Sequence, residues 1–230
     1  MIHFLENNRI LIDGYKNLWN NRNIWHSGLE INIIKNLCNN EVNNIIEFGS
    51  YDGGDGIRYK YFFPNANVYS IEASKNCYNN MKELENINKY NIKTFNYAIS
   101  NYNGYIDFYD TYDHLNKNYA PCGSIKKNLC TTDCGNNNIL EIKNKTNIPC
   151  ITLDTFCKIQ NIKSVDFAHI DVEGHAIEVI EGINEIKPKM IFIEVSSPTH
   201  NHSKEIKNLL IKKNYKIYNY HDETNQIWSL

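Results

Sequence analysis

Short apolar runs typical of buried strands alternate along most of the chain with segments whose apolar residues recur at helical spacing. Strands are predicted at residues 43–48, 68–71, 92–99, 165–170 and 190–193. Helices are predicted at residues 29–38, 58–63, 74–84, 151–159, 175–186 and 203–210, and a closing pair of strands at 216–220 and 226–230. Because strands and helices alternate, we expect an α/β fold whose right-handed βαβ units build a mostly parallel sheet with helices on both faces.

The middle of the chain departs from this rhythm. Residues 105–109 alternate like a small strand, and they are followed by about 35 residues rich in Asn, Lys, Cys and Gly, a long irregular insert of the kind that is usually functional or disordered. No repeat or Pro/Gly-rich linker divides the chain. We therefore predict a single domain over residues 1–230, with an N-terminal helical segment at 1–42 and an insert at 111–149 that acts as a lid.

Composition narrows the class of protein. The 230 residues are 42% hydrophobic and 22% charged, which is ordinary for one globular domain. No run of 18 apolar residues occurs, so we expect no membrane span. Polar residues interrupt every apolar stretch near the N-terminus, so we expect no secretory signal and a cytoplasmic location. The net charge of −2 provides no global basic field and disfavours nucleic acid as a partner, although a local basic groove is left open.

The seven cysteines are odd in number and scattered, so we expect reduced thiols. Cys122, Cys130, Cys134 and Cys150 lack a CxxC pair and have irregular gaps, which disfavours a zinc site. Glu194 is followed by two histidines, and a divalent metal held there together with an acid of the preceding strand is an alternative. We assign no metal ligands.

A glycine-containing loop follows the first buried strand. Its spacing is Glu-x-Gly-x-x-x-Gly and lacks the second glycine of a dinucleotide fingerprint, so it suits the methionine end of S-adenosylmethionine better than a pyrophosphate. Ligands of such sheets bind at the carboxyl ends of the strands. The residues of this loop predicted to contact the cofactor are Glu47, Gly49, Ser50, Tyr51, Asp52 and Gly53.

The next two strands end in residues that complete this prediction. Glu72 ends the second strand, where a carboxylate can accept hydrogen bonds from both ribose hydroxyls. Ala73 follows it. After the third strand, the small Ala98 leaves room for a flat adenine ring.

Three segments carry a resemblance to a known family. ITLDTF at 151–156, AHIDVEGHAIEVIEGI at 168–183 and IFIEVS at 191–196 resemble the FkbM family of S-adenosylmethionine-dependent methyltransferases. The glycine loop, Glu72 and Ala98 precede them in the order of that family, so the resemblance covers about residues 44–196. Two positions depart from the pattern: His169 stands where the family has Lys, and Ala176 where it has Glu.

The resemblance implies a Rossmann-like class I methyltransferase with a mostly parallel seven-stranded sheet and a terminal antiparallel strand. It implies S-adenosylmethionine as the cofactor and O-methylation of a hydroxyl on a sugar, glycan or small metabolite. Catalytic candidates are Asp171, as the base or orienter of the acceptor hydroxyl, then Glu173, His169 and Glu194. We expect Cys122-Gly123-Ser124 in the insert to close over the acceptor.

Each of these positions also has a purely structural interpretation. Asp171 and Glu173 can serve the start of the following helix as a cap and as a first-turn charge, and His169 can be a buried core residue. Two other functions remain open. An RNA ribose or cap 2′-O-methyltransferase would use a basic channel at Lys126, Lys127, Lys143 and Lys145, and a non-catalytic S-adenosylmethionine-binding module would do no chemistry. The oligomeric state is not predicted.

Overall fold

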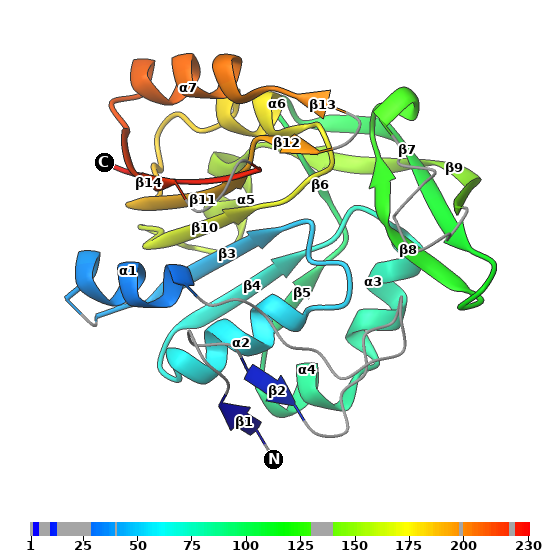
Figure 1. Cartoon of the computed structure of the whole chain (residues 1–230), viewed down its shortest axis with the longest axis horizontal. Coiled ribbons are helices and arrows are strands. Elements are labelled where there is room, and N and C mark those ends of the chain that lie inside the picture. Colours follow the sequence, from blue (N-terminus) through cyan, green and yellow to red (C-terminus); the bar gives the residue numbers. More distant parts are fainter. Residues whose placement is uncertain are drawn as a thin grey trace.

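A seven-stranded sheet forms the centre of the protein (Figure 1). The computed structural model describes residues 2–4, 10–12, 29–39, 41–129, 140–197, 200–220 and 224–230. In sheet order, the strands are β14 (Lys216–Tyr220), β15 (Asn225–Ser229), β11 (Met190–Glu194), β10 (Phe167–Ile170), β3 (Asn44–Phe48), β4 (Asn67–Ile71) and β5 (Lys93–Phe95). β15 runs antiparallel to both of its neighbours, β14 and β11, and all other neighbouring strands of this sheet are parallel. The predicted Rossmann-like class I sheet, with its terminal antiparallel strand, is confirmed.

Side chains alternate between two apolar layers along the central strands. On β10, Ala168 and Ile170 belong to one core cluster and Phe167 to the other. The first cluster lies under α5 (Leu153–Ile159), α6 (Ala176–Glu181) and α7 (Ser203–Lys212). The second lies under α1 (Leu29–Leu37), α2 (Gly54–Phe62), α3 (Lys75–Lys82) and α4 (Glu85–Lys89). Helices therefore cover both faces, because strands buried on both sides must place apolar residues in both directions (Figure 1).

A second sheet packs beside the first, and it corrects two predictions. Its order is β6 (Ala98–Ile99), β9 (Leu140–Ile151), β7 (Gly104–Asp113) and β8 (Asn118–Ser124). The single strand predicted at 92–99 is therefore two strands in two sheets. The prediction of an irregular insert at 111–149 is wrong for 111–113, 118–124 and 140–149, which are strands. Residues 130–139 lie outside the described part of the chain. Polar residues can form these strands because β7 and β9 pair along ten positions.

The N-terminal segment is helical only in part. Residues Ile2–Phe4 (β1) and Ile10–Ile12 (β2) form an antiparallel pair, so the helical prediction is wrong there, whereas α1 confirms it for 29–37. Residues 5–9 and 13–28 of the predicted segment lie outside the described residues. A short antiparallel pair also joins β12 (Ser196–Ser197) to β13 (His200–Asn201). The predicted helix at 175–186 ends at Glu181, with Gly182 as its C-cap. Gly182 lies against the backbone of Ser100, where a Cβ would be 2.2 Å from a carbonyl oxygen. Among the described residues, no helix is long and apolar enough to cross a membrane.

The order of the strands determines where a ligand can bind. From β3 the chain proceeds to β4 and β5 on one side, and after the second sheet it returns to β10 and β11 on the other. The direction of the strand order therefore reverses between β3 and β10. In open α/β sheets, the crevice beyond the carboxyl ends of the strands at such a reversal is where ligands bind.

Candidate active site

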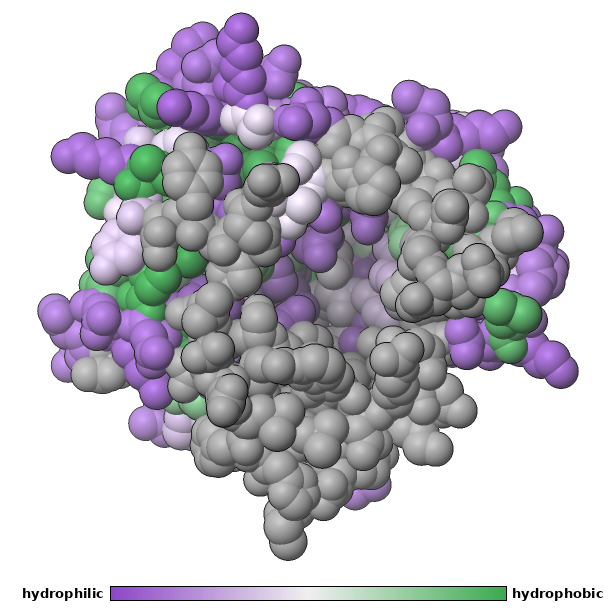
Figure 2. Space-filling model, in the orientation of Figure 1, coloured by the Kyte–Doolittle hydropathy of each residue, from purple (hydrophilic) through white to green (hydrophobic). Residues whose placement is uncertain are grey.

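A cavity of ≈ 250 Å³ opens at this reversal point. The loop after β3, the end of β4 and the loop after β10 contribute to its wall, together with residues of the second sheet that include Ala98, Phe108, Ala120, Pro121 and Gly123. The space-filling surface is hollowed near the centre of the face seen in Figure 2. Most of the predicted cofactor residues line the cavity: Glu47, Gly49, Ser50, Tyr51, Asp52, Glu72, Ala73 and Ala98.

Gly49 packs against the strand next to its own. Its φ of +83° is in the left-handed region, and a Cβ at this position would lie 1.6 Å from the backbone oxygen of Asp171. Its N–H donates to the carbonyl of Ile71 over 2.9 Å. Only glycine permits this approach, so the loop is held close to both β4 and β10.

Gly53 lies behind the loop instead of facing the cavity. It is absent from the cavity wall, and a Cβ on it would meet the side chains of Ile87 and Met81 at 2.5 and 3.1 Å. Its φ of +74° makes the turn into α2. The geometry therefore gives Gly53 a conformational role and does not support the predicted contact with a cofactor.

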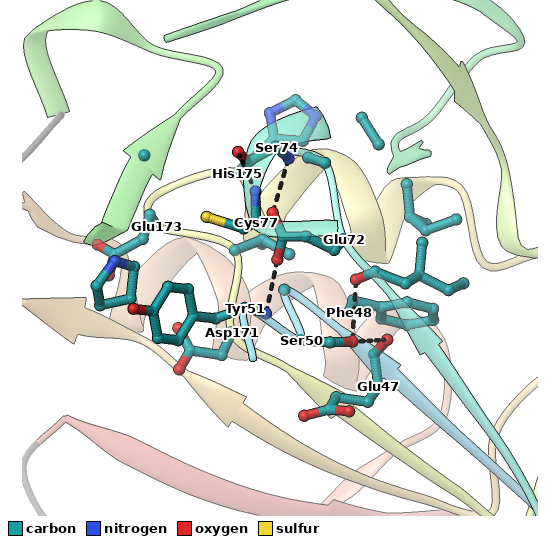
Figure 3. Close-up of a pocket in the computed structure, with 18 of the residues that line it drawn as sticks. Glu47, Phe48, Ser50, Tyr51, Glu72, Ser74, Cys77, Asp171, Glu173 and His175 are labelled. Atoms are coloured by element: carbon teal, nitrogen blue, oxygen red, sulfur yellow. Dashed lines mark hydrogen bonds between the residues drawn. The ribbon is translucent and has the colours of Figure 1, made fainter. Parts of the chain in front are cut away.

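Glu72 is fixed at the end of β4 by two backbone donors (Figure 3). Its Oε2 accepts from the N–H of Tyr51 and its Oε1 from the N–H of Ser74, each over 2.7 Å. Burial raises the pKa of this carboxyl to about 7, although both hydrogen bonds favour the charged form. Each carboxylate oxygen keeps a second lone pair, so Glu72 can still accept hydrogen bonds from a ligand in the cavity.

Sequence reasoning missed Asp110, which ties the second sheet to this wall. It lies on β7, and its carboxylate accepts hydrogen bonds from the Ser74 hydroxyl and, over 3.2 Å, from Nδ2 of Asn76. Ser74 is the N-cap of α3, as predicted. The alternation of side chains along β7, which places Phe108 and Asp110 on the same face, could have identified Asp110. The sequence prediction ended this strand at residue 109.

Three of the four predicted catalytic residues come together. Asp171 follows β10, Glu173 lies two residues later and Glu194 ends β11; one carboxylate oxygen from each lies within 4.8 Å of the others. Asp171 and Glu173 line the cavity, whereas Glu194 does not. The Asp171 side chain is exposed into the cavity. The surrounding protein reduces the hydration of its carboxyl group and so raises its pKa; the nearby His169 opposes this shift and Asp55 adds to it. Glu173 itself has a left-handed φ of 43°.

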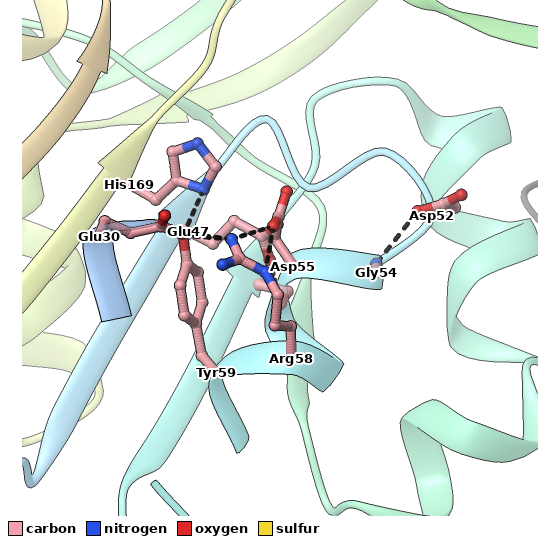
Figure 4. A network of polar contacts seen from close by, with 9 residues as sticks. Glu30, Glu47, Asp52, Gly54, Asp55, Arg58, Tyr59 and His169 are labelled. Atoms are coloured by element: carbon pink, nitrogen blue, oxygen red, sulfur yellow. Dashed lines mark hydrogen bonds and ion pairs between the residues drawn. The ribbon is translucent and has the colours of Figure 1, made fainter. Parts of the chain in front are cut away.

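His169, the fourth candidate, points to the α1 and α2 side of the sheet (Figure 4). It is 7% exposed, and its Nδ1 lies 3.0 Å from the hydroxyl of Tyr59. Glu47, its register partner on β3, lies on the same side and accepts a hydrogen bond of 2.7 Å from the Ser70 hydroxyl. Burial, more than the nearby Asp55, raises the pKa of Glu47 well above its usual value. His169 is both a buried residue and part of the cavity wall.

His175 is a second residue that sequence reasoning did not single out. Its Nε2 lies 3.1 Å from the Ser100 hydroxyl and its Nδ1 3.3 Å from Oε2 of Glu178. Burial lowers its pKa to about 4, so its imidazole is neutral near pH 7. No sequence signal marked its contact with Ser100, because Ser100 lies 75 residues earlier in the chain.

The end of β8 is attached to the loop after β10. The Ser124 hydroxyl donates to the carbonyl of Glu173 over 2.7 Å. Nζ of Lys126 donates to the carbonyl of Gly174 over 3.2 Å and pairs with Oε1 of Glu178 at 2.9 Å. The segment expected to close over an acceptor thus contacts the loop that carries Asp171.

All described cysteines are buried free thiols: Cys38, Cys77, Cys122, Cys150 and Cys157.

Comparison with known proteins gives one family match and several more distant similarities. The family model described as the methyltransferase FkbM domain matches residues 30–220. The 2-O-methyltransferase NoeI of Sinorhizobium fredii is 28% identical over 159 residues, which cover 65% of this chain and 60% of NoeI. The chain thus spans less than two thirds of that relative's length.

Solved structures resemble the chain distantly. A precorrin-6y C5,15-methyltransferase from Geobacter metallireducens has a TM-score of 0.45 and 8% identity, covering 86% of both chains. The N-terminal domain of human METTL16 in complex with S-adenosylhomocysteine (SAH) has a TM-score of 0.46 and 10% identity, covering 86% of this chain and 66% of that one.

Proposed function

The chain belongs to the FkbM methyltransferase family, and from this we propose that it transfers a methyl group from S-adenosylmethionine to a hydroxyl of a sugar, glycan or other small metabolite. The relative NoeI, named a 2-O-methyltransferase, supports oxygen as the acceptor atom. We also propose that residues 1–230 act as one catalytic domain, in which the second sheet forms the acceptor-side cover. The cytoplasmic location stays a prediction.

The observation that carries the proposal is the buried Glu72 carboxylate in the cavity wall. Two backbone N–H groups hold it at the end of β4, and Gly49 and Ala98 line the same cavity. This arrangement suits a ribose at Glu72, an adenine beside Ala98 and the amino acid end along the loop at Gly49. The residues present therefore fit S-adenosylmethionine.

Asp171 is the group best located to act on the acceptor. When bound, S-adenosylmethionine would supply a sulfonium methyl group to an oxygen nucleophile, with S-adenosylhomocysteine as the leaving group. A neutral alcohol is a weak nucleophile, so the protein must orient the hydroxyl and take up its proton. Asp171 and Glu72 both line the cavity, and the raised pKa of Asp171 makes its carboxylate a stronger base than an ordinary aspartate. Alignment and proton removal are then this chain's contribution to the reaction.

The observations disfavour RNA as the acceptor. Three of the four lysines expected to form a basic channel pair with acids: Lys126 with Glu178, Lys143 with Glu141 and Lys145 with Asp107. Their charges are therefore largely compensated, whereas an RNA-binding groove needs free cations toward the phosphates.

A transfer assay tests the proposal directly. Purified protein is incubated with methyl-labelled S-adenosylmethionine and, in parallel, with neutral sugars, oligosaccharides, sugar nucleotides and capped RNA. We expect label in a carbohydrate or small-metabolite fraction and not in RNA. Label in capped RNA would favour the ribose methyltransferase, and binding of the donor without transfer to any acceptor would favour a non-catalytic binding module.

A further inference from the structure

A buried group of polar side chains lies on the α1 and α2 side of the central sheet (Figure 4). Glu47, Asp55 and His169 each offer one ligand atom, and these atoms lie within 4.8 Å of one another. All three residues line the cavity. Two carboxylates and one imidazole form a mixed oxygen and nitrogen donor set, which suits first-row divalent cations such as Mn²⁺ and Zn²⁺.

Each of these three side chains is oriented by a neighbour. The Tyr59 hydroxyl lies 3.0 Å from Nδ1 of His169, the Ser70 hydroxyl donates to Oε2 of Glu47 over 2.7 Å, and Arg58 donates from Nε to Oδ1 of Asp55 over 3.1 Å. Metal-binding residues in proteins have outer partners of this kind, which fix the ring or carboxylate for the ion.

Gly56 provides the space that the Glu47 carboxylate and its hydrogen-bond partner Ser70 occupy. A Cβ at position 56 would lie 2.5 Å from the Ser70 hydroxyl and 3.2 Å from Oε2 of Glu47. Any larger residue would therefore displace the hydrogen bond that orients Glu47. This glycine has no left-handed φ, so its small size, and not its backbone freedom, is what the site uses.

Among the described side chains, acidic groups outnumber basic ones at this place. Glu30, Glu47 and Asp55 converge there, and Arg58 contacts two of them, Glu30 and Asp55, at 2.5 Å each. Glu47, which is 2% exposed, interacts instead with a neutral serine. A buried carboxylate near like charges must take up a proton or bind a cation. A carboxylate has two oxygens, so Asp55 can contact Arg58 and a cation at once.

We propose that Glu47, Asp55 and His169 bind a first-row divalent cation at the wall of the cavity, with open coordination positions toward it. Three protein ligands with an open position are the arrangement found in catalytic metal sites. Such an ion would polarise a hydroxyl bound beside Asp171. The binding site itself does not depend on the proposed methyl transfer and is tested without it.

The test uses tag-free, chelator-treated protein titrated with Co²⁺, followed by visible absorption and by heat. We expect one equivalent to bind with ligand-field bands, and Zn²⁺ to displace it. Glu47→Gln and His169→Gln should each weaken binding by at least ~100-fold. Tyr59→Phe keeps all three ligands and should weaken it by about 10–100-fold through loss of orientation. Thermal melting followed by circular dichroism identifies variants that do not fold. If the variants of the ligands themselves do not fold, the Co²⁺ affinity of Tyr59→Phe tests the proposal.

Glu194→Gln is the matched control, because it removes a carboxylate from the other acidic group formed with Asp171 and Glu173. It should bind Co²⁺ like the wild type. Even a weak metal site, with a dissociation constant of about 10⁻³ M, would be half occupied at about 1 mM Co²⁺. Absence of binding at that concentration would therefore overturn the proposal. Binding lost in Glu194→Gln and retained in Glu47→Gln and Tyr59→Phe would also overturn it, since the ion would then lie at the other group.

Discussion

The backbone of Gly49 lies directly against the backbone carbonyl of Asp171, so close that a Cβ at position 49 would be 1.6 Å from that oxygen. The N–H of Asp171 in turn donates to the carbonyl of Phe48 over 3.0 Å. The loop assigned to the donor and the residue assigned to the acceptor are therefore positioned by the same contact. A change at one of them is transmitted to the other through the backbone.

Gly49→Ala should disrupt both stability and binding. The added Cβ has to move the loop away from β10, and the left-handed φ adds strain, so we expect a loss of about 2–4 kcal/mol in the free energy of unfolding. Chemical denaturation measures this loss. Gly104→Ala is the control, because its Cβ would meet only the ring of Tyr102, at an ordinary 3.4 Å. Equal stability of the two variants would contradict the close contact.

The raised pKa of Glu72 predicts a pH dependence of stability. Its pKa of about 7 in the folded protein exceeds the 4.5 of an unperturbed carboxyl, so the folded state binds this proton more tightly. Stability from this group is therefore full below about pH 4.5 and falls as the pH rises toward 7, by roughly 3 kcal/mol. Denaturation of wild type and Glu72→Gln between pH 4 and 8 measures it. The difference between the two curves should change over that range, and parallel curves would refute the assignment.

Asp171→Asn should separate chemistry from donor binding. The substitution keeps the shape of the side chain and removes its basicity, a contribution that typically amounts to 10²–10⁴-fold in rate. Once an acceptor is identified, turnover should fall in that range, while SAH affinity stays within about threefold, below the tenfold that corresponds to 1.4 kcal/mol. Near-normal turnover would reduce Asp171 to a structural residue and make Glu173 the next candidate.

The cover formed by the second sheet should respond to the acceptor. β8 is the edge strand of its sheet, and its end is attached to the loop after β10 through Ser124 and Glu173. Hydrogen exchange at residues 118–124 should become slower when SAH and acceptor are both present. The central strand β3 is an internal control and should not change. Identical exchange at 118–124 with and without ligands would exclude a lid.

Most of the central sheet could be predicted from the sequence, because its strands are buried on both faces and appear as apolar runs. The run at 92–99 was misassigned because it crosses from one sheet to another at Tyr97. The second sheet escaped prediction for a different reason. Asn144, Lys145 and Asn147 on β9 are polar, and they form a strand because β7 pairs with them and not because they are apolar.

The site was predictable where it depends on strand ends. Glu72 and Asp171 were found because parallel strands bring their carboxyl ends to one edge of the sheet. Asp55, Asp110 and His175 were not, because each acquires its surroundings from contacts between distant elements. The apolar period of a strand or helix carries no information on such contacts.

Titration of the protein with SAH tests the central claim most directly, because it requires no knowledge of the acceptor. Wild-type protein should bind one equivalent, and Glu72→Gln should bind it about 10–100-fold more weakly, the loss expected when a buried hydrogen-bonded charge is removed. The variant's folding is checked by its melting curve. Absence of SAH binding by folded wild-type protein, tighter binding of NAD, or unchanged affinity in Glu72→Gln would contradict the assignment of this cavity to S-adenosylmethionine.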